Sequence, residues 1–514
     1  MRPPCSVRVL ELLFTLNTVS KRAAVMNDSG HYALIILVAS AVGLVALMAN
    51  RLTERFKIPV PLFVLAGSAL ASSLMPALPT PPERTVERII TVALVLVLFD
   101  GGMHIGWSRF REAASPILTV GVLGTFLTAA GAALVLHVGF GLSWYLAMLV
   151  ATAVAPTDPA VVFSVLGKRE VTGRSGTILE GESGANDPVG IALMASLLAA
   201  GGLSAAGFLT VGVEFVQQML IGGVIGVLGG RALAVFIRRV SLPSEGLYPL
   251  RTLAVSLMLY GLATLAHGSG FLAVFIAGIV IGDLRAPYKP EIERFHAALA
   301  GLAEIVAFAV LGLTVDLQII TRADVWIPGL VLGIVMMIVV RPLAVGACLA
   351  PVNLRRNEQF FIMIAGLKGA VPILLGEFLR AAHVPQAERL YGIVVVVVAF
   401  SVLVQGSSVP ALARMLRVPM RVTSPEPWAV SVRLRDEPRG VHRLTVATGS
   451  TADGATVEGL SDHADDIWVS IVVRARRLVP VGADTQLRAG DDVVILAKPE
   501  LAEELSVLFH GPTR

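Results

Sequence analysis

Long apolar segments separated by short polar loops fill most of the chain. From His31 onward thirteen such segments recur, and each approaches the roughly 17 to 25 residues that an α-helix needs to cross a bilayer. This pattern predicts an all-α polytopic membrane protein with about 13 transmembrane helices. The segments cover residues 31–50, 59–76, 86–102, 115–137, 142–166, 177–200, 211–237, 248–267, 269–284, 293–317, 325–350, 359–382 and 389–415.

The basic residues of the loops predict the orientation of the chain. They follow the odd-numbered segments, as with Arg109 and Arg111 after the third and Arg355 and Arg356 after the eleventh. Loops after even-numbered segments carry little excess positive charge. By the positive-inside rule the N-terminus lies outside and the C-terminus lies in the cytoplasm. We therefore expect a multi-pass protein of the plasma membrane, which in a bacterium is the inner membrane.

Residues 1–30 form an N-terminal extension with a weak pattern. Arg2 precedes a short apolar run that Glu11 interrupts, and no clear small-residue cleavage site follows. Two interpretations stay open: a signal peptide, or a reading frame whose true first residue is Met26.

The pattern changes after Arg421. Three prolines mark a linker over residues 417–440, and residues 441–514 have the alternation of a soluble α+β domain. A domain of this size is only marginally stable alone, which favours dimerisation. Its predicted elements are strands at Val469–Val473 and Val493–Ala497 and a closing helix at Leu501–Phe509.

Composition excludes several classes of protein. Of the 514 residues, 55% are hydrophobic and 15% are charged, and the net charge is only +4. Together with a mean hydropathy of +0.77, this excludes a soluble globular enzyme. No basic patch suggests a nucleic-acid partner. The two cysteines, Cys5 and Cys348, indicate neither a disulfide framework nor a metal site, and no cofactor is expected.

Polar residues interrupt the fifth segment in a way that apolar packing does not require. Thr157 and Asp158 stand between Pro156 and Pro159. Each proline removes a backbone donor and disfavours a helix before it, so the helix should break here and free carbonyls beside a carboxylate. Because a charge at bilayer depth costs about 2.5 to 3.5 kcal/mol on insertion scales, Asp158 needs a function or a partner.

Four polar residues of the sixth segment form two pairs. Glu182 and Asn186 are four residues apart, as are Ser183 and Asp187, so each pair shares one face of the helix. We expect Asp187 to face Asp158 from the neighbouring helix. The two segments together predict an ion site in the membrane.

A second interruption lies in the twelfth segment, where Gly366, Lys368, Gly369 and Pro372 follow each other closely. Two broken helices in corresponding positions of two halves are typical of an inverted-repeat transporter. Lys368 is expected to offset the negative ends of the half-helix dipoles there. The alternative is a lysine whose long side chain reaches the membrane surface.

Another buried charge needs a partner. Arg341 lies inside the eleventh segment, where an unpaired guanidinium is costly. Glu182 is the first candidate, followed by Glu377 and Glu304. Asp283 lies near a helix end and is expected to cap it or to be hydrated.

Three other interpretations of these polar residues were open. They can be packing residues that satisfy one another. An intramembrane aspartyl protease of the presenilin type needs a GxGD turn, and Gly184–Asp187 does not match it. A cation channel or facilitator without proton coupling can use the same ligands, although no carbonyl-rich filter such as TVGYG is present.

Four runs carry a family resemblance: LFDGGMH at 98–104, TDPAVVFS at 157–164, GESGANDP at 181–188 and GLKGAVP at 366–372. They resemble those of monovalent cation:proton antiporters of the NhaP-like type, in its potassium/proton branch. The resemblance covers residues 31–416. It implies inverted repeats with two crossing broken helices, a homodimer, and no metal site beyond the transported cation.

The resemblance also implies a role for each polar residue. Asp187 would carry either the cation or the proton, and Ser183 would help to coordinate the cation. Thr157 and Asp158 would lie at the crossing of the broken helices, and Asn186 would hold this crossing together. Glu182 and Arg341 would form a structural ion pair. Potassium is the favoured cation on the resemblance alone, because oxygen ligands suit sodium as well.

A mechanism follows from competition. A proton and a bound cation each neutralise a buried carboxylate, so they exclude one another at Asp187. Asn186, where an Asp would add a second titratable group, favours one proton per cation and an electroneutral cycle.

The tail carries a resemblance of its own. RARRLVP at 474–480 and LRAGDDVVIL at 487–496 resemble the TrkA C-terminal (RCK_C) regulatory domain, which makes residues 441–514 a candidate site for a small regulatory ligand.

Overall fold

The computed structural model describes residues 60–74, 81–158, 162, 166, 169–202, 205–284, 286–422, 440–461, 467–475 and 477–510. The chain divides into two compact units, residues 1–424 and 425–514, which we call the membrane unit and the tail unit. Each has a hydrophobic core of its own. The N-terminal extension, the first predicted segment and most of the predicted linker lie outside the described residues.

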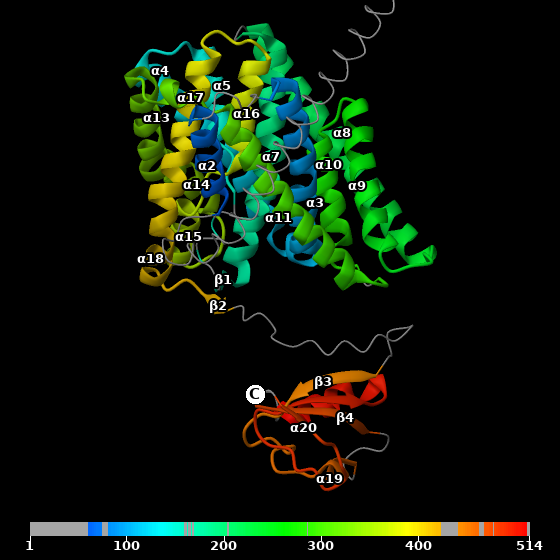
Figure 1. Ribbon diagram of the computed structural model, residues 1–514. Helices are drawn as coiled ribbons and strands as arrows, with labels where there is room; N and C mark the ends of the chain where they lie inside the picture. Colours follow the sequence, from blue (N-terminus) through cyan, green and yellow to red (C-terminus); the bar gives the residue numbers. More distant parts are fainter. Residues whose placement is uncertain are drawn as a thin grey trace, which may run out of the picture. The chain divides into compact units, whose positions relative to one another are not determined.

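Helices make up the membrane unit (Figure 1). Most of them follow the predicted apolar segments. In a bilayer the backbone N–H and C=O groups of such a segment must pair with one another, and a helix achieves this. They are α2 (Val60–Leu74), α3 (Glu83–Leu118), α4 (Thr125–Phe140), α5 (Trp144–Val154), α7 (Gly173–Ala200), α8 (Ala205–Arg239), α9 (Leu247–Leu265), α10 (Gly270–Gly282), α11 (Lys289–Thr314), α12 (Leu317–Ile320), α13 (Ala323–Val335), α14 (Arg341–Leu349), α15 (Arg356–Ile364), α16 (Ala370–Ala381), α17 (Ala387–Phe400) and α18 (Ser407–Met415).

Several helical stretches have the length and composition of membrane spans. Within the described residues there are five: Glu83–Phe140, Leu209–Arg239, Lys289–Thr314, Ala323–Leu349 and Ala387–Met415. Large apolar side chains remain exposed on their outer faces, as with Val138, Leu220 and Leu343. Such faces suit lipid rather than water. The chain is a multi-pass membrane protein, and the count of thirteen spans stays a prediction.

Wider π-helical turns interrupt three of the long helices in the described part of the chain. They are η1 (Thr119–Gly124) before α4, η2 (Met336–Val340) before α14 and η3 (Ser401–Gly406) before α18. Such turns occur frequently at functional sites, because they turn side chains away from the regular helical register. Here η1 precedes α5 in the first half, and η2 precedes α15 in the second half.

The boundary predicted between the third and fourth segments is present as a break within α3. The backbone leaves helical geometry at Gly106, with φ 66° and ψ 165°, which lies in the gap between the two predicted segments. Asp283 accepts a hydrogen bond there from the backbone N–H of Ser108 at 2.6 Å. A side chain at position 106 would overlap the Asp283 carboxylate. Asp283 therefore caps the part of α3 after Gly106, which is one of its two expected roles.

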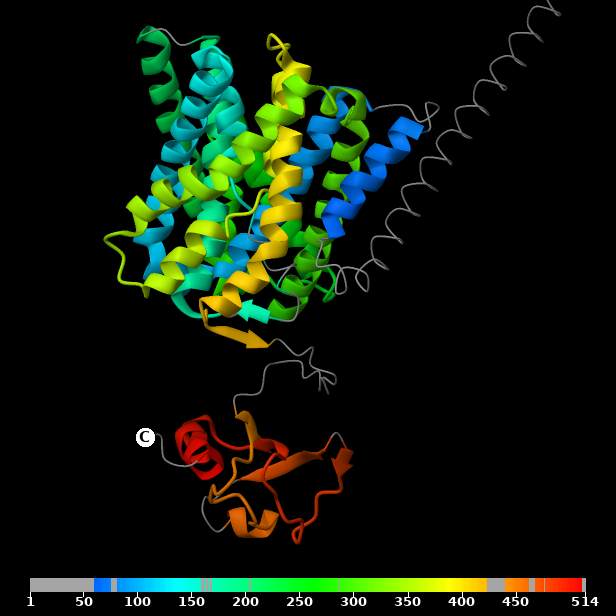
Figure 2. The same cartoon turned by 90° about the vertical axis from the view of Figure 1, so that its left-hand side faces the viewer.

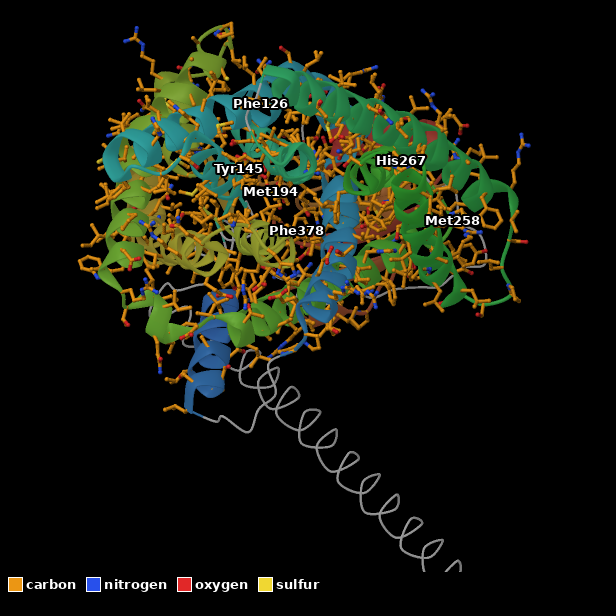
Figure 3. All side chains as sticks on the ribbon, turned by 90° about the horizontal axis from the view of Figure 1, so that it is seen from above. Phe126, Tyr145, Met194, Met258, His267 and Phe378 are labelled. Atoms are coloured by element: carbon orange, nitrogen blue, oxygen red, sulfur yellow. The ribbon has the colours of Figure 1, made fainter. Side chains whose placement is uncertain are left out.

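The helices that carry the polar residues lie inside the membrane unit. Figure 3 shows Met194 of α7 and Phe378 of α16 toward the middle of the unit and Met258 of α9 at its edge. Met194 is fully buried, whereas 54% of the Met258 surface is exposed. Polar side chains on α7 thus depend on protein partners rather than on lipid or water.

A short β-ribbon joins two distant parts of the membrane unit (Figure 2). Strand β1 (Arg169–Val171), directly before α7, pairs antiparallel with β2 (Met420–Val422), which follows α18. The backbone N–H of Thr172 extends the pairing by donating to the carbonyl of Pro419 at 3.0 Å. The start of α7 is thereby tied to the end of the membrane unit.

The tail unit is a small α+β fold. Its antiparallel sheet has the order β3-β6-β4-β5. Two strands and the closing helix lie within one residue of the predicted positions. Two strands were not predicted: β3, which carries His442 and Arg443 side by side, and β5, which has only three residues. The elements are β3 (Val441–Thr445), α19 (Val457–Ser461), β4 (Trp468–Arg474), β5 (Arg477–Val479), β6 (Asp492–Leu496), a 3₁₀ turn at Pro499–Leu501 and α20 (Ala502–His510).

A buried carboxylate holds the turn before β6. Asp491 accepts hydrogen bonds from Arg474 Nε at 2.9 Å and Nη2 at 2.8 Å, and from the backbone N–H of Arg488 at 2.9 Å. Burial alone would raise the pKa of Asp491, but the bonds from Arg474 and Arg488 outweigh it and lower this pKa below its usual value.

This arrangement predicts a pH-dependent stability of the tail unit. Because the folded-state pKa of Asp491 is below its unfolded value, its stabilisation is complete above about pH 4 and is lost as the pH falls through the folded-state pKa. Asp491→Asn should lose about 1.5 to 3 kcal/mol of stability at pH 7. In the whole protein, the hydrogen-exchange protection of β4 and β6 should therefore fall by roughly ten- to a hundredfold. The difference from wild type should shrink toward pH 3. A difference that stays constant with pH contradicts the assignment, and Asp484→Asn, at an exposed position, is the control.

Candidate functional site

The first half of the site is built on the interruption that follows α5. Ser143 caps the start of this helix by accepting from the backbone N–H of Leu146 at 3.4 Å. The helix ends at Val154, and the chain from Pro156 to Asp158 is non-helical. The predicted break at Pro156 is thus present. It leaves carbonyl groups at the end of α5 without helical donors.

The second half is the interruption between α15 and α16. The chain from Ala365 to Gly369 is non-helical, and it crosses the first interruption, because the backbone N–H of Asp158 donates to the carbonyl of Leu367 at 2.8 Å. The two predicted broken helices therefore meet. The meeting point contains backbone from both halves of the membrane unit.

Lys368 lies at this crossing and is 3% exposed. Its Nζ donates to the carbonyl of Ala155 at 2.9 Å and to that of Pro156 at 3.1 Å. These carbonyls form the negative end of α5, so the ammonium group offsets the helix dipole there. The side chain is buried and held by backbone carbonyls, which disfavours the alternative of a lysine that reaches the membrane surface.

Two glycines allow the segments to approach so closely. A side chain at position 369 would overlap the carboxylate of Asp158, and one at position 366 would overlap the guanidinium of Arg341. The close approach to Asp158 therefore requires glycine at position 369.

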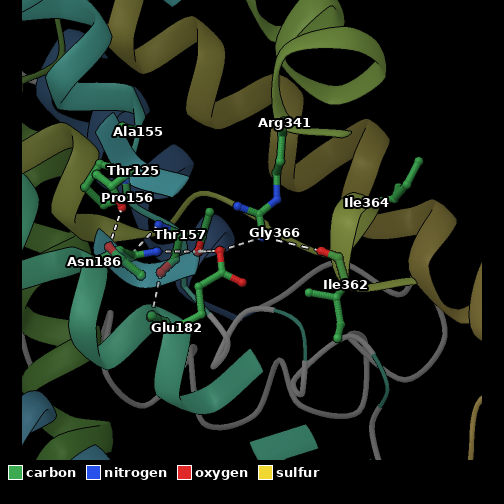
Figure 4. Close-up of polar contacts among 12 residues, drawn as sticks. Thr125, Ala155, Pro156, Thr157, Glu182, Asn186, Arg341, Ile362, Ile364 and Gly366 are labelled. Carbon is green, nitrogen blue, oxygen red and sulfur yellow. Dashed lines mark hydrogen bonds and ion pairs between the residues drawn. The ribbon is translucent and has the colours of Figure 1, made fainter. Parts of the chain in front are cut away.

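Residues of α7 fix Thr157 from the neighbouring helix (Figure 4). Asn186 donates from Nδ2 to Thr157 Oγ1 at 2.8 Å, and its Oδ1 accepts from the Thr157 backbone N–H at 3.4 Å. Ser183 Oγ donates to the Thr157 carbonyl at 2.5 Å. Thr157 Oγ1 in turn donates to Glu182 Oε1 at 3.5 Å. Every polar group of Thr157 is thus engaged by three residues of one helix.

A buried ion pair ties α7 to α14. Arg341 Nη2 lies 2.8 Å from Glu182 Oε1, and these side chains are 4% and 3% exposed (Figure 4). Arg341 Nη2 also donates to the carbonyl of Ile362 at 3.4 Å. Of the three candidate carboxylates, all in the described part of the chain, Glu182 pairs with Arg341. Glu377 pairs with Arg380 of its own helix at 3.0 Å.

Asp187 follows Asn186 on α7 and is 9% exposed. It lies within electrostatic reach of Asp158 and Lys368. The structure therefore brings both predicted acids and the predicted lysine to one buried region, together with the carbonyl and hydroxyl oxygens of the crossing. Carboxylate, hydroxyl and carbonyl oxygens are the ligands that hard cations prefer.

Two residues at the crossing gave no sequence signal. Ser401 and Gln405 lie on η3, and Ser401 Oγ accepts from the backbone N–H of Lys368 at 3.1 Å. Both are neutral and stand inside a long apolar run, where such residues commonly serve packing. The Ser/Gln pair at a spacing of four was the only pattern from which they could have been found.

The chain is similar to several known proteins. The sodium/hydrogen exchanger transmembrane family matches residues 38–415. The K(+)/H(+) antiporter NhaP of Alkalimonas amylolytica is 33% identical over 389 residues, which cover 75% of this chain and 67% of that protein. The K(+)/H(+) antiporter NhaP2 of Shewanella oneidensis is 31% identical over 482 residues, covering 92% and 83%.

Solved structures show the same fold. The sodium proton antiporter MjNhaP1 of Methanocaldococcus jannaschii at pH 8 superposes with a TM-score of 0.64 at 20% identity. The superposition covers 75% of this chain and 99% of that one.

The close approach at Gly369 predicts a steric effect. Gly369→Ala should lower the thermal unfolding temperature of the purified protein in detergent, because overpacking at a buried contact costs about 1 to 3 kcal/mol. Gly301→Ala on α11 is the matched control, since nothing lies within 4 Å of a side chain there. Equal unfolding temperatures for the two variants would show that the crossing is looser than described.

The buried ion pair predicts a non-additive double substitution. Arg341→Met leaves Glu182 charged and unpaired, which should cost about 3 to 5 kcal/mol of stability. Adding Glu182→Gln removes that charge and should recover part of the loss. Unfolding of the two single variants and the double variant in detergent measures the coupling. Additive losses would contradict a direct pair.

Proposed function

The chain belongs to the sodium/hydrogen exchanger family, and from this premise we propose that it exchanges potassium, or less favourably sodium, for protons across the plasma membrane. It is a secondary transporter and not an enzyme. The proposed cycle is electroneutral and works by alternating access, in which the site faces one side of the membrane and then the other.

One observation carries the proposal: the polar groups of Thr157 are fully engaged at the crossing, while the buried Asp187 lies beside it. The crossing supplies neutral oxygens, and Asp187 and Asp158 supply charge. A cation bound at Asp187 and a proton on its carboxylate neutralise the same charge. They therefore compete, and the competition becomes exchange if only the neutralised site reorients.

The proposed roles divide the residues into two groups. Asp187, Asp158, Thr157 and Ser183 bind the cation or proton, with Asn186 holding the crossing. Glu182 and Arg341 form a structural ion pair, and Lys368 is the fixed charge of the broken helix. Both ends of the Asn186 amide are occupied by Thr157. An amide does not titrate, which supports one proton per cation.

Potassium is proposed from the names of the two curated relatives, both K(+)/H(+) antiporters. The oxygen ligands themselves suit either ion, because selectivity depends on the size and coordination number of the cavity.

The surroundings of the membrane unit belong to the proposal as well. The N-terminus faces the outside and the C-terminus the cytoplasm, as the loop charges predict. The membrane units form a homodimer. The tail unit, with its resemblance to TrkA C-terminal domains, is the proposed site of a small regulatory ligand.

The test is transport by purified protein in proteoliposomes with a trapped pH dye. With an acidic lumen, external potassium should make the lumen alkaline, and sodium should do so less effectively. Asp187→Asn should abolish this response, because an amide neither binds a proton at these pH values nor attracts a cation. Asp316→Asn is the matched control, since Asp316 only caps α12 and an Asn caps a helix equally well.

The outcomes separate the alternatives. Potassium flux without proton movement in the wild type would replace exchange by a channel or facilitator. Transport driven by an imposed membrane potential alone would exclude the electroneutral cycle while leaving exchange in place.

A further inference from the structure

We infer that Ser401 and Gln405 are positioning residues for the exchange: together they hold the second crossing segment, and through it Lys368 and Asp158, in register with Asp187. This inference rests on the proposed function. It concerns two uncharged residues on η3 that are 3% and 4% exposed.

The Gln405 amide group satisfies the end of α15. Its Nε2 donates to the carbonyl of Ile364 at 2.6 Å and to that of Gly366 at 3.2 Å. The chain is not helical beyond Ile364, so these carbonyls lack the donors that a continuing helix would supply. A buried carbonyl without a partner is costly, and Gln405 supplies both hydrogens from one nitrogen.

The other end of the amide fixes the start of α16. Gln405 Oε1 accepts from Ser401 Oγ at 2.9 Å, and Ser401 Oγ accepts from the backbone N–H of Lys368 at 3.1 Å. The hydrogen bonds therefore run in one direction, from Lys368 through Ser401 to Gln405 and on to Ile364 and Gly366. A reversed amide would place its oxygen against two carbonyl oxygens, so the orientation of Gln405 is determined by its surroundings.

The segment from Ile364 to Lys368, held in this way, contacts Asp158 and carries Lys368. Between the two anchored positions, Leu367 accepts from the backbone of Asp158. Lys368 places its ammonium group on the carbonyls that end α5. Asp158 and Lys368 both lie within electrostatic reach of Asp187. Releasing the segment moves both charges relative to Asp187 and alters the competition between proton and cation.

The first half of the chain uses the same device. There, a hydroxyl and an amide of one helix, Ser183 and Asn186 of α7, engage both backbone groups of Thr157. In the second half, Ser401 and Gln405 engage the segment from Ile364 to Lys368. Each interruption is thus fastened by a serine and an amide from one helical element that lies later in the sequence. The two halves thus use the same pair of residue types, although the sequences around Ser183 and Ser401 are different.

The experiment compares Gln405→Met, Ser401→Ala and Ser401→Thr with wild type in proteoliposomes. Initial exchange rates are measured against potassium concentration and against pH. Gln405→Met should raise the apparent KM for potassium at least about fivefold, which corresponds to the loss of one hydrogen bond. It should also shift the pH of half-maximal exchange. Ser401→Ala should act in the same direction, and Ser401→Thr should restore wild-type values because it keeps the hydroxyl.

Ser407→Ala is the matched control, because Ser407 is exposed and donates only to Val404 of its own helix. It should leave KM and the pH profile unchanged. If Gln405→Met does not fold, Ser401→Ala decides, since it removes a single hydroxyl. A lower maximal rate with unchanged KM and pH profile would overturn the positioning role while exchange by the wild type stands. No exchange by the wild type would overturn the proposed function itself, together with this inference.

Discussion

The structure depends on how two broken helices satisfy their backbone inside a membrane. A bilayer supplies no water to pair freed N–H and C=O groups, so protein groups must do it. The carbonyls that end α5 accept from Lys368, and both backbone groups of Thr157 are bound by α7. Asp158 and Leu367 pair across the crossing. The polar groups that look costly in the sequence are thus largely the partners that make the breaks stable.

The same contacts make the proposed ion site a joint product of both halves of the membrane unit. Glu182 on α7 pairs with Arg341 on α14, and the guanidinium lies where a side chain at Gly366 would be. Asp158 lies equally close to Gly369. Because a buried pair tolerates the loss of one partner poorly, α7 and α14 are held together at the depth of the site. Neither half carries the complete set of ligands and counter-charges.

Strong local signals made much of this site predictable. A proline pair around Thr157 and Asp158, and acids in an apolar segment, stand out because each is costly without a purpose. The break at Gly106 was predicted only as a gap between two apolar segments, and its partner Asp283 was not predictable, since Asp283 is distant in sequence. Ser401 and Gln405 were missed for a related reason: a neutral polar residue carries meaning only when its partners are known. The strands β3 and β5 show the same limit, because short strands are defined by their pairing.

The charges around Asp187 bear on stoichiometry. Asp187 and Asp158 contribute two negative charges when ionised, and Lys368 contributes one positive charge when protonated. These three side chains sum to one net negative charge, provided that the buried Glu304, which lies within electrostatic reach of Asp158, is protonated. A single proton neutralises it, and so does a single monovalent cation. A second cation would leave the buried group with a net positive charge at a high desolvation cost. Asn186 reinforces the balance, because an acid at its position would add a further negative charge and require a further neutralising ion. The fixed lysine and the amide are therefore consistent with the proposed exchange of one for one.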